Sequence, residues 1–157
     1  MGPGESVGTE IMETASELGR LIAEAGWNLL TGGRNTGVMH AASKGACLAG
    51  GTVVGILPGS TGEGMSEYVT LPIITGMGHA RNVINILSSD AVVVCGMGPG
   101  TASEASIAIK SGKTVVFTCT EPETFTFFSR IAPLQCMSAN SPAETMTLLK
   151  TILKVHL

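Results

Sequence analysis

The chain has 157 residues, enough for one domain with its own core, and 44% of them are hydrophobic against 13% charged. Its formal net charge of −3 argues against a general nucleic-acid-binding surface. No apolar run reaches the roughly 18 residues that a membrane span needs, so no membrane partner is expected. Together, these properties predict a single domain over residues 1–157 that binds neither nucleic acid nor a membrane.

The four cysteines lie far apart, within apolar segments, and form no CxxC pair. This spacing favours free thiols over a disulfide or a zinc site, and free thiols are typical of a reducing compartment. No basic stretch leads into an apolar segment as in a signal peptide, so the expected location is cytoplasmic.

Helical and extended patterns alternate along the chain. They predict a helix over 8–25, a strand over 27–31, a helix over 38–49 and a strand over 52–57. After a polar loop at 60–67, they predict a strand over 71–74 (an edge strand, because it contains proline), a helix over 79–88, a strand over 91–95 and a helix over 102–110. A strand over 114–118, a helix over 122–130, a short segment at 133–137 and a helix over 142–154 complete the order. Short apolar strands separated by helices indicate an α/β fold, with a doubly wound, mainly parallel sheet and helices on both faces.

A doubly wound domain normally opens with a strand, and none is predicted before the first helix. Residues 1–4, Met-Gly-Pro-Gly, have the composition of the turn after such a strand. We expect either that the strand lies outside this sequence or that the sheet has one strand fewer.

Three glycine-rich turns follow predicted strands, at 32–37, 76–78 and 96–101. Ligands bind such sheets at the carboxyl ends of the strands. Glycine lets the backbone approach an anion, and the free N–H groups at a helix start point toward it. The turn at 96–101 therefore predicts a phosphate cradle. Thr101 and Glu104 are also spaced as in a capping box, so Thr101 is either a phosphate ligand or the helix cap.

Charged side chains accompany these turns. Arg34 suits a phosphate or oxoanion, the alternative being an uninvolved surface arginine. Arg81 follows the turn at 76–78 and is expected to bind the ligand or to pair with Glu104. Glu104 has three candidate roles: capping its helix, binding a ribose or pterin group, or stabilising an oxocarbenium-like transition state.

Histidines give no reason to expect a metal site. His40 and His79 lack partners at metal-ligand spacing. His156 belongs to the C-terminal tail and is expected to be solvated.

Three segments carry a family resemblance: Thr-Gly-Gly-Arg-Asn-Thr-Gly-Val-Met at 31–39, Gly-His-Ala-Arg-Asn at 78–82 and Gly-Pro-Gly-Thr-Ala-Ser-Glu at 98–104. The chain resembles the Lonely-Guy-like, or lysine-decarboxylase-like, Rossmann superfamily. Within it, the sequences of these segments are most similar to those of the molybdenum cofactor carrier proteins. The resemblance implies a Rossmann-like subunit, a homodimer or homotetramer, and a pocket for a phosphorylated ligand.

The two branches of this superfamily imply different functions. Carriers bind the molybdenum cofactor, a pterin dithiolene ending in a phosphate, as cargo that they protect and hand to molybdenum-dependent apo-enzymes. Lonely-Guy enzymes hydrolyse the base–ribose bond of cytokinin riboside monophosphates with an arginine and a glutamate, which Arg81 and Glu104 match by position. The enzyme motif begins Pro-Gly-Gly, whereas here Gly-Met-Gly precedes Pro99, and this difference favours the carrier.

We therefore expect a non-catalytic carrier of the molybdenum cofactor, with a phosphoribohydrolase using Arg81 and Glu104, or a generic nucleotide-binding protein, as alternatives. No metal ligands are expected. The residues expected to contact the ligand are Gly32, Gly33, Arg34, Asn35, Gly76, Gly78, Arg81, Gly98, Pro99, Gly100, Thr101 and Glu104.

Overall fold

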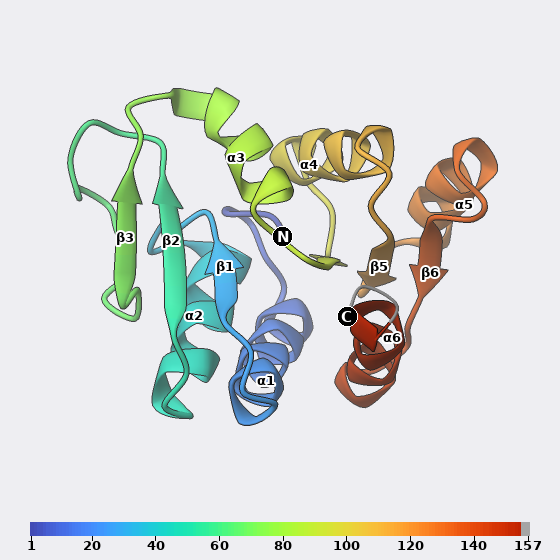
Figure 1. Cartoon of the computed structure of the whole chain (residues 1–157), viewed down its shortest axis with the longest axis horizontal. Coiled ribbons are helices and arrows are strands. Elements are labelled where there is room, and N and C mark those ends of the chain that lie inside the picture. The colour runs from blue at the N-terminus through green and yellow to red at the C-terminus, as the bar shows by residue number, and fades with distance from the viewer. Residues whose placement is uncertain (155–157) are drawn as a thin grey trace.

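The computed structural model describes residues 1–154, so that His156 lies outside the described residues. Helices and strands alternate in the expected order (Figure 1). The elements are α1 (Thr9–Glu24), β1 (Leu29–Thr31), α2 (Gly37–Leu48), β2 (Val53–Leu57), β3 (Leu71–Ile74), the 3₁₀ turn η1 (Gly78–Ala80), α3 (Arg81–Leu87), β4 (Val92–Cys95), α4 (Pro99–Lys110), β5 (Val115–Thr118), α5 (Pro122–Ile131), β6 (Cys136–Ser138) and α6 (Pro142–Lys154). Among the described residues, none of the helices combines the length and the apolar character needed to cross a bilayer.

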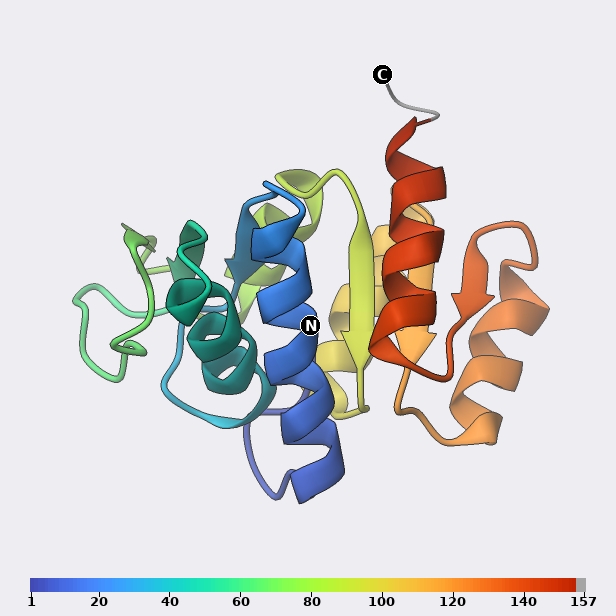
Figure 2. The same ribbon diagram turned by 90° about the horizontal axis from the view of Figure 1, so that it is seen from below.

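All strand pairs are parallel, in the orders β1-β2-β3 and β4-β5-β6. Helices α1, α2 and α6 cover one face, and α3 and α4 cover the other (Figure 2). The α/β architecture expected from the sequence is therefore confirmed. Strand β3, which contains Pro72, lies at an edge, as predicted, because proline offers no N–H to a further strand.

The backbone ladder is interrupted between β1 and β4. There the Met1 ammonium donates to the carbonyl oxygen of Val93 at 2.6 Å, and the amide of Cys95 donates to the Met1 carbonyl at 2.8 Å. These bonds to residues on either side of Val94 are those of a parallel strand. Met1 thus extends the sheet by one residue beside β4 and leads the N-terminal loop, residues 2–7, across the carboxyl ends of the strands.

Close helix packing holds the first half of the domain together. Gly19 of α1 and Gly45 of α2 have no room for a Cβ, because the backbone of the other helix lies against each of them. In the second half, Phe117 of β5 is fully buried and packs against Phe128 of α5, with ring centroids 5.3 Å apart. Both halves of the domain are therefore closely packed.

The structure corrects the predicted start of the fourth α-helix. Helix α4 begins at Pro99, three residues earlier than expected, and its N-cap is Gly98, with no side-chain cap. Proline suits the first helical position because its φ is already helical and its missing N–H is not needed there. The expected capping box is therefore wrong: Thr101 lies inside the first turn, and Glu104 is not needed for a cap.

Candidate functional site

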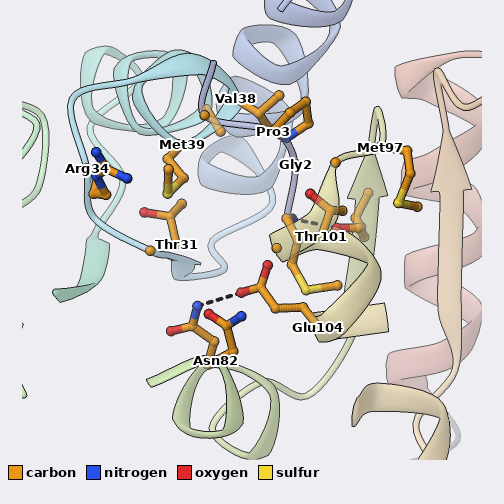
Figure 3. A pocket seen from close by; sticks show the side chains of 18 of the residues that line it. Gly2, Pro3, Thr31, Arg34, Val38, Met39, Asn82, Met97, Thr101 and Glu104 are labelled. Carbon is orange, nitrogen blue, oxygen red and sulfur yellow. Dashed lines mark hydrogen bonds between the residues drawn. The ribbon is translucent and has the colours of Figure 1, made fainter. Parts of the chain in front are cut away.

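A cavity of about 580 Å³ opens between β1 and β4 at their carboxyl ends. Its walls come from the N-terminal loop, the end of β1, the start of α2, helix α3 and the first turns of α4 (Figure 3). A volume of this size suits a nucleotide or a cofactor of similar dimensions.

The structure brings most of the predicted ligand residues to this cavity. Those that line it are Gly32, Arg34, Arg81, Gly98, Pro99, Gly100, Thr101 and Glu104. Gly33, Asn35, Gly76 and Gly78 are not part of its walls.

The four residues outside the walls shape the neighbouring turns instead. Gly33 has a φ of 72° and packs against Gly55, and the amide of Asn35 donates to the Gly64 carbonyl at 2.9 Å. The amides of Gly76 and Gly78 donate to the carbonyls of residues 59 and 58, at 2.9 Å in both cases. These bonds fix the loops on either side of β3.

The first turn of α4 has backbone amides without an acceptor. Pro99 has no N–H, and the amides of Gly100 and Thr101 have no hydrogen-bond acceptor within residues 1–154. The Thr101 side chain is 2% exposed, and its Oγ1 has no hydrogen-bond partner. A buried hydroxyl without a partner, beside free N–H groups at a helix start, is what a bound phosphate would satisfy.

At the start of α2, the N-terminal loop already binds one of the backbone amides. The amide of Val38 donates to the carbonyl of Pro3 at 3.0 Å, so the N-terminal loop takes the place of an anion there. At the first turn of α4, by contrast, no loop of the described chain supplies an acceptor to the amides of Gly100 and Thr101. Sequence reasoning missed this loop, although Gly2 and Gly4 beside Pro3 signal close backbone approach.

Arg81 forms the cationic wall of the cavity. Its side chain is 11% exposed, lies against the Cα of Gly32, and brings Nη1 within 3.8 Å of Glu104 Oε1. Burial lowers the pKa of Arg81, Glu104 opposes this shift and Arg34 adds to it. Because a guanidinium keeps its charge in proteins, burial leaves a poorly solvated cation that favours a nearby anion. Arg34, by contrast, is exposed at the rim.

Glu104 is held by helix α3. Its Oε1 accepts a hydrogen bond from Asn85 Nδ2 at 2.8 Å, and the side chain of Asn82 lies beside it (Figure 3). Sequence reasoning missed both asparagines. The available signal was their position on α3: Asn85 lies four residues after Arg81 and shares its face of the helix, and Asn82 follows Arg81 directly.

The two described histidines lie in different places. His79 lines the cavity, whereas His40 Nδ1 lies 3.0 Å from Ser66 Oγ and ties α2 to the loop at 60–67. Nowhere in residues 1–154 do three or more His, Cys, Asp or Glu side chains gather as they would around a metal ion.

The chain matches the model of the SLOG cluster4 family over residues 1–146. Among solved structures, it is similar to the molybdenum cofactor binding protein of the phototrophic bacterium Rippkaea orientalis, with 44% identity and a TM-score of 0.94, covering 98% of this chain and 94% of that one. It is also similar to the molybdenum cofactor carrier protein of Chlamydomonas reinhardtii, with 45% identity and a TM-score of 0.92, covering 98% and 95%.

A more distant similarity connects the chain to an enzyme. It is 34% identical over 102 residues to a cytokinin riboside 5′-monophosphate phosphoribohydrolase of Mycobacterium tuberculosis, covering 60% of this chain and 52% of that protein. The chain thus spans about half the length of this enzyme.

Proposed function

The chain belongs to the SLOG cluster4 family, and from this premise we propose that it binds the molybdenum cofactor and carries it without changing it chemically. The observation that supports this most strongly is the agreement with cofactor-binding and carrier proteins over 98% of the chain. The fold alone would not settle function. The unpaired amides of Gly100 and Thr101 and the buried cation of Arg81 support this proposal, because both would suit a phosphorylated ligand.

The cavity suits each part of such a ligand. Its phosphate would lie on the amides of Gly100 and Thr101 and accept a hydrogen bond from the Thr101 hydroxyl. Arg81 would neutralise part of the negative charge on the ligand, and Arg34 would hold the ligand at the rim. The remaining walls, which include Val38 and the methionine side chains of the cavity, would shield the oxidation-prone dithiolene from solvent.

One observation favours hydrolysis as a second candidate. Arg81 and Glu104 form the charged pair that the resemblance assigns to the phosphoribohydrolases, and they lie together at the cavity. In that reaction Glu104 would stabilise the oxocarbenium-like sugar while water adds at its anomeric carbon and the base departs with a proton. We rank this second because the Asn85 hydrogen bond engages the Glu104 carboxylate and Pro99 departs from the enzyme motif.

Anaerobic reconstitution separates the two functions. The purified chain, incubated with free molybdenum cofactor and passed through a desalting column, is expected to retain pterin and molybdenum together and to reactivate a cofactor-free molybdenum enzyme. The same preparation with AMP or a cytokinin riboside monophosphate is expected to release no free base. Base release at an enzymatic rate, lost in Glu104→Ala, would replace the carrier with a hydrolase, and failure to retain the cofactor would refute the carrier.

We also propose that the chain forms a homodimer or homotetramer and delivers its cargo to molybdenum-dependent apo-enzymes. Exposed apolar side chains on β3 and α3 support self-association, with Leu71, Ile74 and Leu87 each more than half exposed. The free cysteines of the described part of the chain suit the reducing cytoplasm as its location.

A further inference from the structure

Three polar side chains form a cluster in the cavity that phosphate binding leaves unused. Asn82, Asn85 and Glu104, here called the amide–carboxylate cluster, are 6%, 3% and 7% exposed. Buried polar atoms are normally hydrogen-bonded. One hydrogen bond joins this cluster, from Asn85 Nδ2 to Glu104 Oε1. A set of buried groups with so few partners within the described chain points to a ligand.

The open atoms of the cluster are mostly acceptors. Asn85 gives its N–H to Glu104, so its Oδ1 remains a buried acceptor without a partner. In the described residues, Glu104 Oε2 takes part in no hydrogen bond, and neither does the Asn82 amide, which can both donate and accept. A ligand that satisfies this cluster must bring several N–H donors and one acceptor on the same edge.

We propose that the amide–carboxylate cluster reads a 2-amino-4-oxopyrimidine edge, the ring edge that pterins share with guanine. This inference rests on the proposed function, whose cargo is a pterin. The edge offers a ring N–H and an exocyclic amine side by side, next to a carbonyl oxygen. Glu104 Oε2 accepts from the adjacent N–H donors, and Asn82 Nδ2 donates to the carbonyl.

Adenine does not complement the cluster. Its edge places one amine beside a ring nitrogen with a lone pair, and that lone pair would face the carboxylate. Buried acceptors left without a donor cost affinity, which is why sites built for an N–H group reject analogues that lack it. A sugar diol could also donate to Glu104, but the affinity would then not depend on which base the sugar carries.

Helix α4 connects this edge to the phosphate cradle. Thr101 and Glu104 are three residues apart, so they lie on the same face of the helix, about 4.5 Å apart along its axis. Figure 3 shows both side chains turned toward the cavity, with Asn82 beside Glu104. A single ligand in this cavity would therefore contact both residues.

Three nucleotides with the same sugar and phosphate test the proposal. Isothermal titration of the whole chain with GMP, IMP and AMP is expected to give GMP the highest affinity, at least about tenfold above AMP, since hydrogen bonds to charged groups are the stronger kind. IMP, which lacks the exocyclic amine, is expected to fall between them. Equal affinities, tighter binding of AMP, or no binding of any of the three would overturn the proposal.

Variants locate the effect. Glu104→Gln is expected to lower the affinity for GMP to nearly that for AMP. Asn82→Ala is expected to reduce the difference between the two affinities, because the hydrogen bond to the carbonyl of guanine is lost. The matched control is Glu123→Gln, an exposed glutamate in the first turn of α5, which is expected to keep the preference for GMP. Thermal unfolding of each variant establishes that it is folded, and a folded pair of cluster variants with undiminished GMP preference refutes the assignment.

Cofactor retention by the same preparations separates this inference from the proposed function. If the chain retains the cofactor but shows no preference for GMP, the inference about the ring edge is refuted and the carrier function is not. A preference for GMP without cofactor retention refutes the carrier function and leaves the ring assignment standing.

Discussion

The guanidinium of Arg81 lies directly against the Cα of Gly32, so that a Cβ on residue 32 would stand 2.6 Å from Arg81 Cζ. Gly32 begins the loop after β1, and Arg81 begins α3, so two segments far apart in the sequence meet at this point. The absence of a side chain at Gly32 is what gives the buried cation its place in the cavity.

Gly32→Ala is therefore expected to weaken cofactor binding without unfolding the chain. Its backbone is not in the left-handed region, so alanine is tolerated there, and the clash is with the end of a flexible side chain. Displacing Arg81 is expected to cost at least about tenfold in affinity, or about 1.4 kcal/mol. Titration with the cofactor measures the loss.

Two controls accompany this substitution. Gly62→Ala, at a position with nothing near the new Cβ, is expected to change neither affinity nor stability. In an Arg81→Ala background, Gly32→Ala is expected to cost nothing further, because both changes remove the same interaction. Additive losses in the double variant would contradict the relationship.

Thr101→Val is expected to raise stability and lower affinity at once. The hydroxyl is buried without a partner, so replacing it with a methyl group is expected to add about 1 kcal/mol to the free energy of unfolding. The same change removes a donor to the phosphate and is expected to weaken binding about tenfold. Urea unfolding and ligand titration measure the two effects on one preparation.

Thr118→Val is the matched control for this pair of effects. Thr118 Oγ1 is also buried without a partner, but Thr118 is not among the residues that line the cavity. We expect the same gain in stability with affinity unchanged. If Thr101→Val binds the cofactor like the native chain, the hydroxyl is not a phosphate ligand.

Local patterns in the sequence were enough to predict the elements but not their contacts. Apolar periodicity located the helices and strands, because burial of one face repeats with the geometry of each element. The start of α4 was predicted three residues too late, because a helix that begins with proline needs no side-chain cap.

The candidate site was predicted in part for the same reason. Glycine turns after strands mark a ligand edge locally, and the cavity was found there. The hydrogen bond from Asn85 to Glu104 joins residues 19 apart on two different helices. It exists because α3 packs on α4, and no spacing rule within either helix predicts that packing.

Gly45→Ala is expected to destabilise the fold. Alanine favours a helix over glycine by about 1 kcal/mol, but the new Cβ would collide with the backbone of Ser16 in α1. Because backbone atoms of two packed helices cannot yield locally, we expect the clash to dominate, with a net loss of about 1–3 kcal/mol in unfolding free energy. Urea unfolding checks it against Gly62→Ala, and an unchanged or higher stability would show that α1 and α2 can separate at little cost.

The buried thiol of Cys95 predicts a loss of stability at alkaline pH. Burial at the end of β4 raises the pKa of Cys95 from 9.0 to about 12, the neighbouring Cys119 adds to the shift, and the Met1 ammonium opposes it. Above pH 9 the thiol ionises in the unfolded chain while the folded chain keeps the proton. The contribution of Cys95 is therefore complete below pH 9 and is lost as the pH rises toward 12, by up to about 1.4 kcal/mol per pH unit.

Comparison with Cys95→Ala isolates the contribution of the Cys95 thiol to the unfolding free energy, because every other group that titrates in the same pH range is common to both chains. The difference in unfolding free energy between the native chain and Cys95→Ala, from urea titrations at pH 8 to 10.5, is expected to be constant up to pH 9. Above that it should shift steadily against the native chain. A difference that stays constant over the whole range would mean that the Cys95 thiol ionises alike in the folded and unfolded chains, and that the end of β4 is open to water.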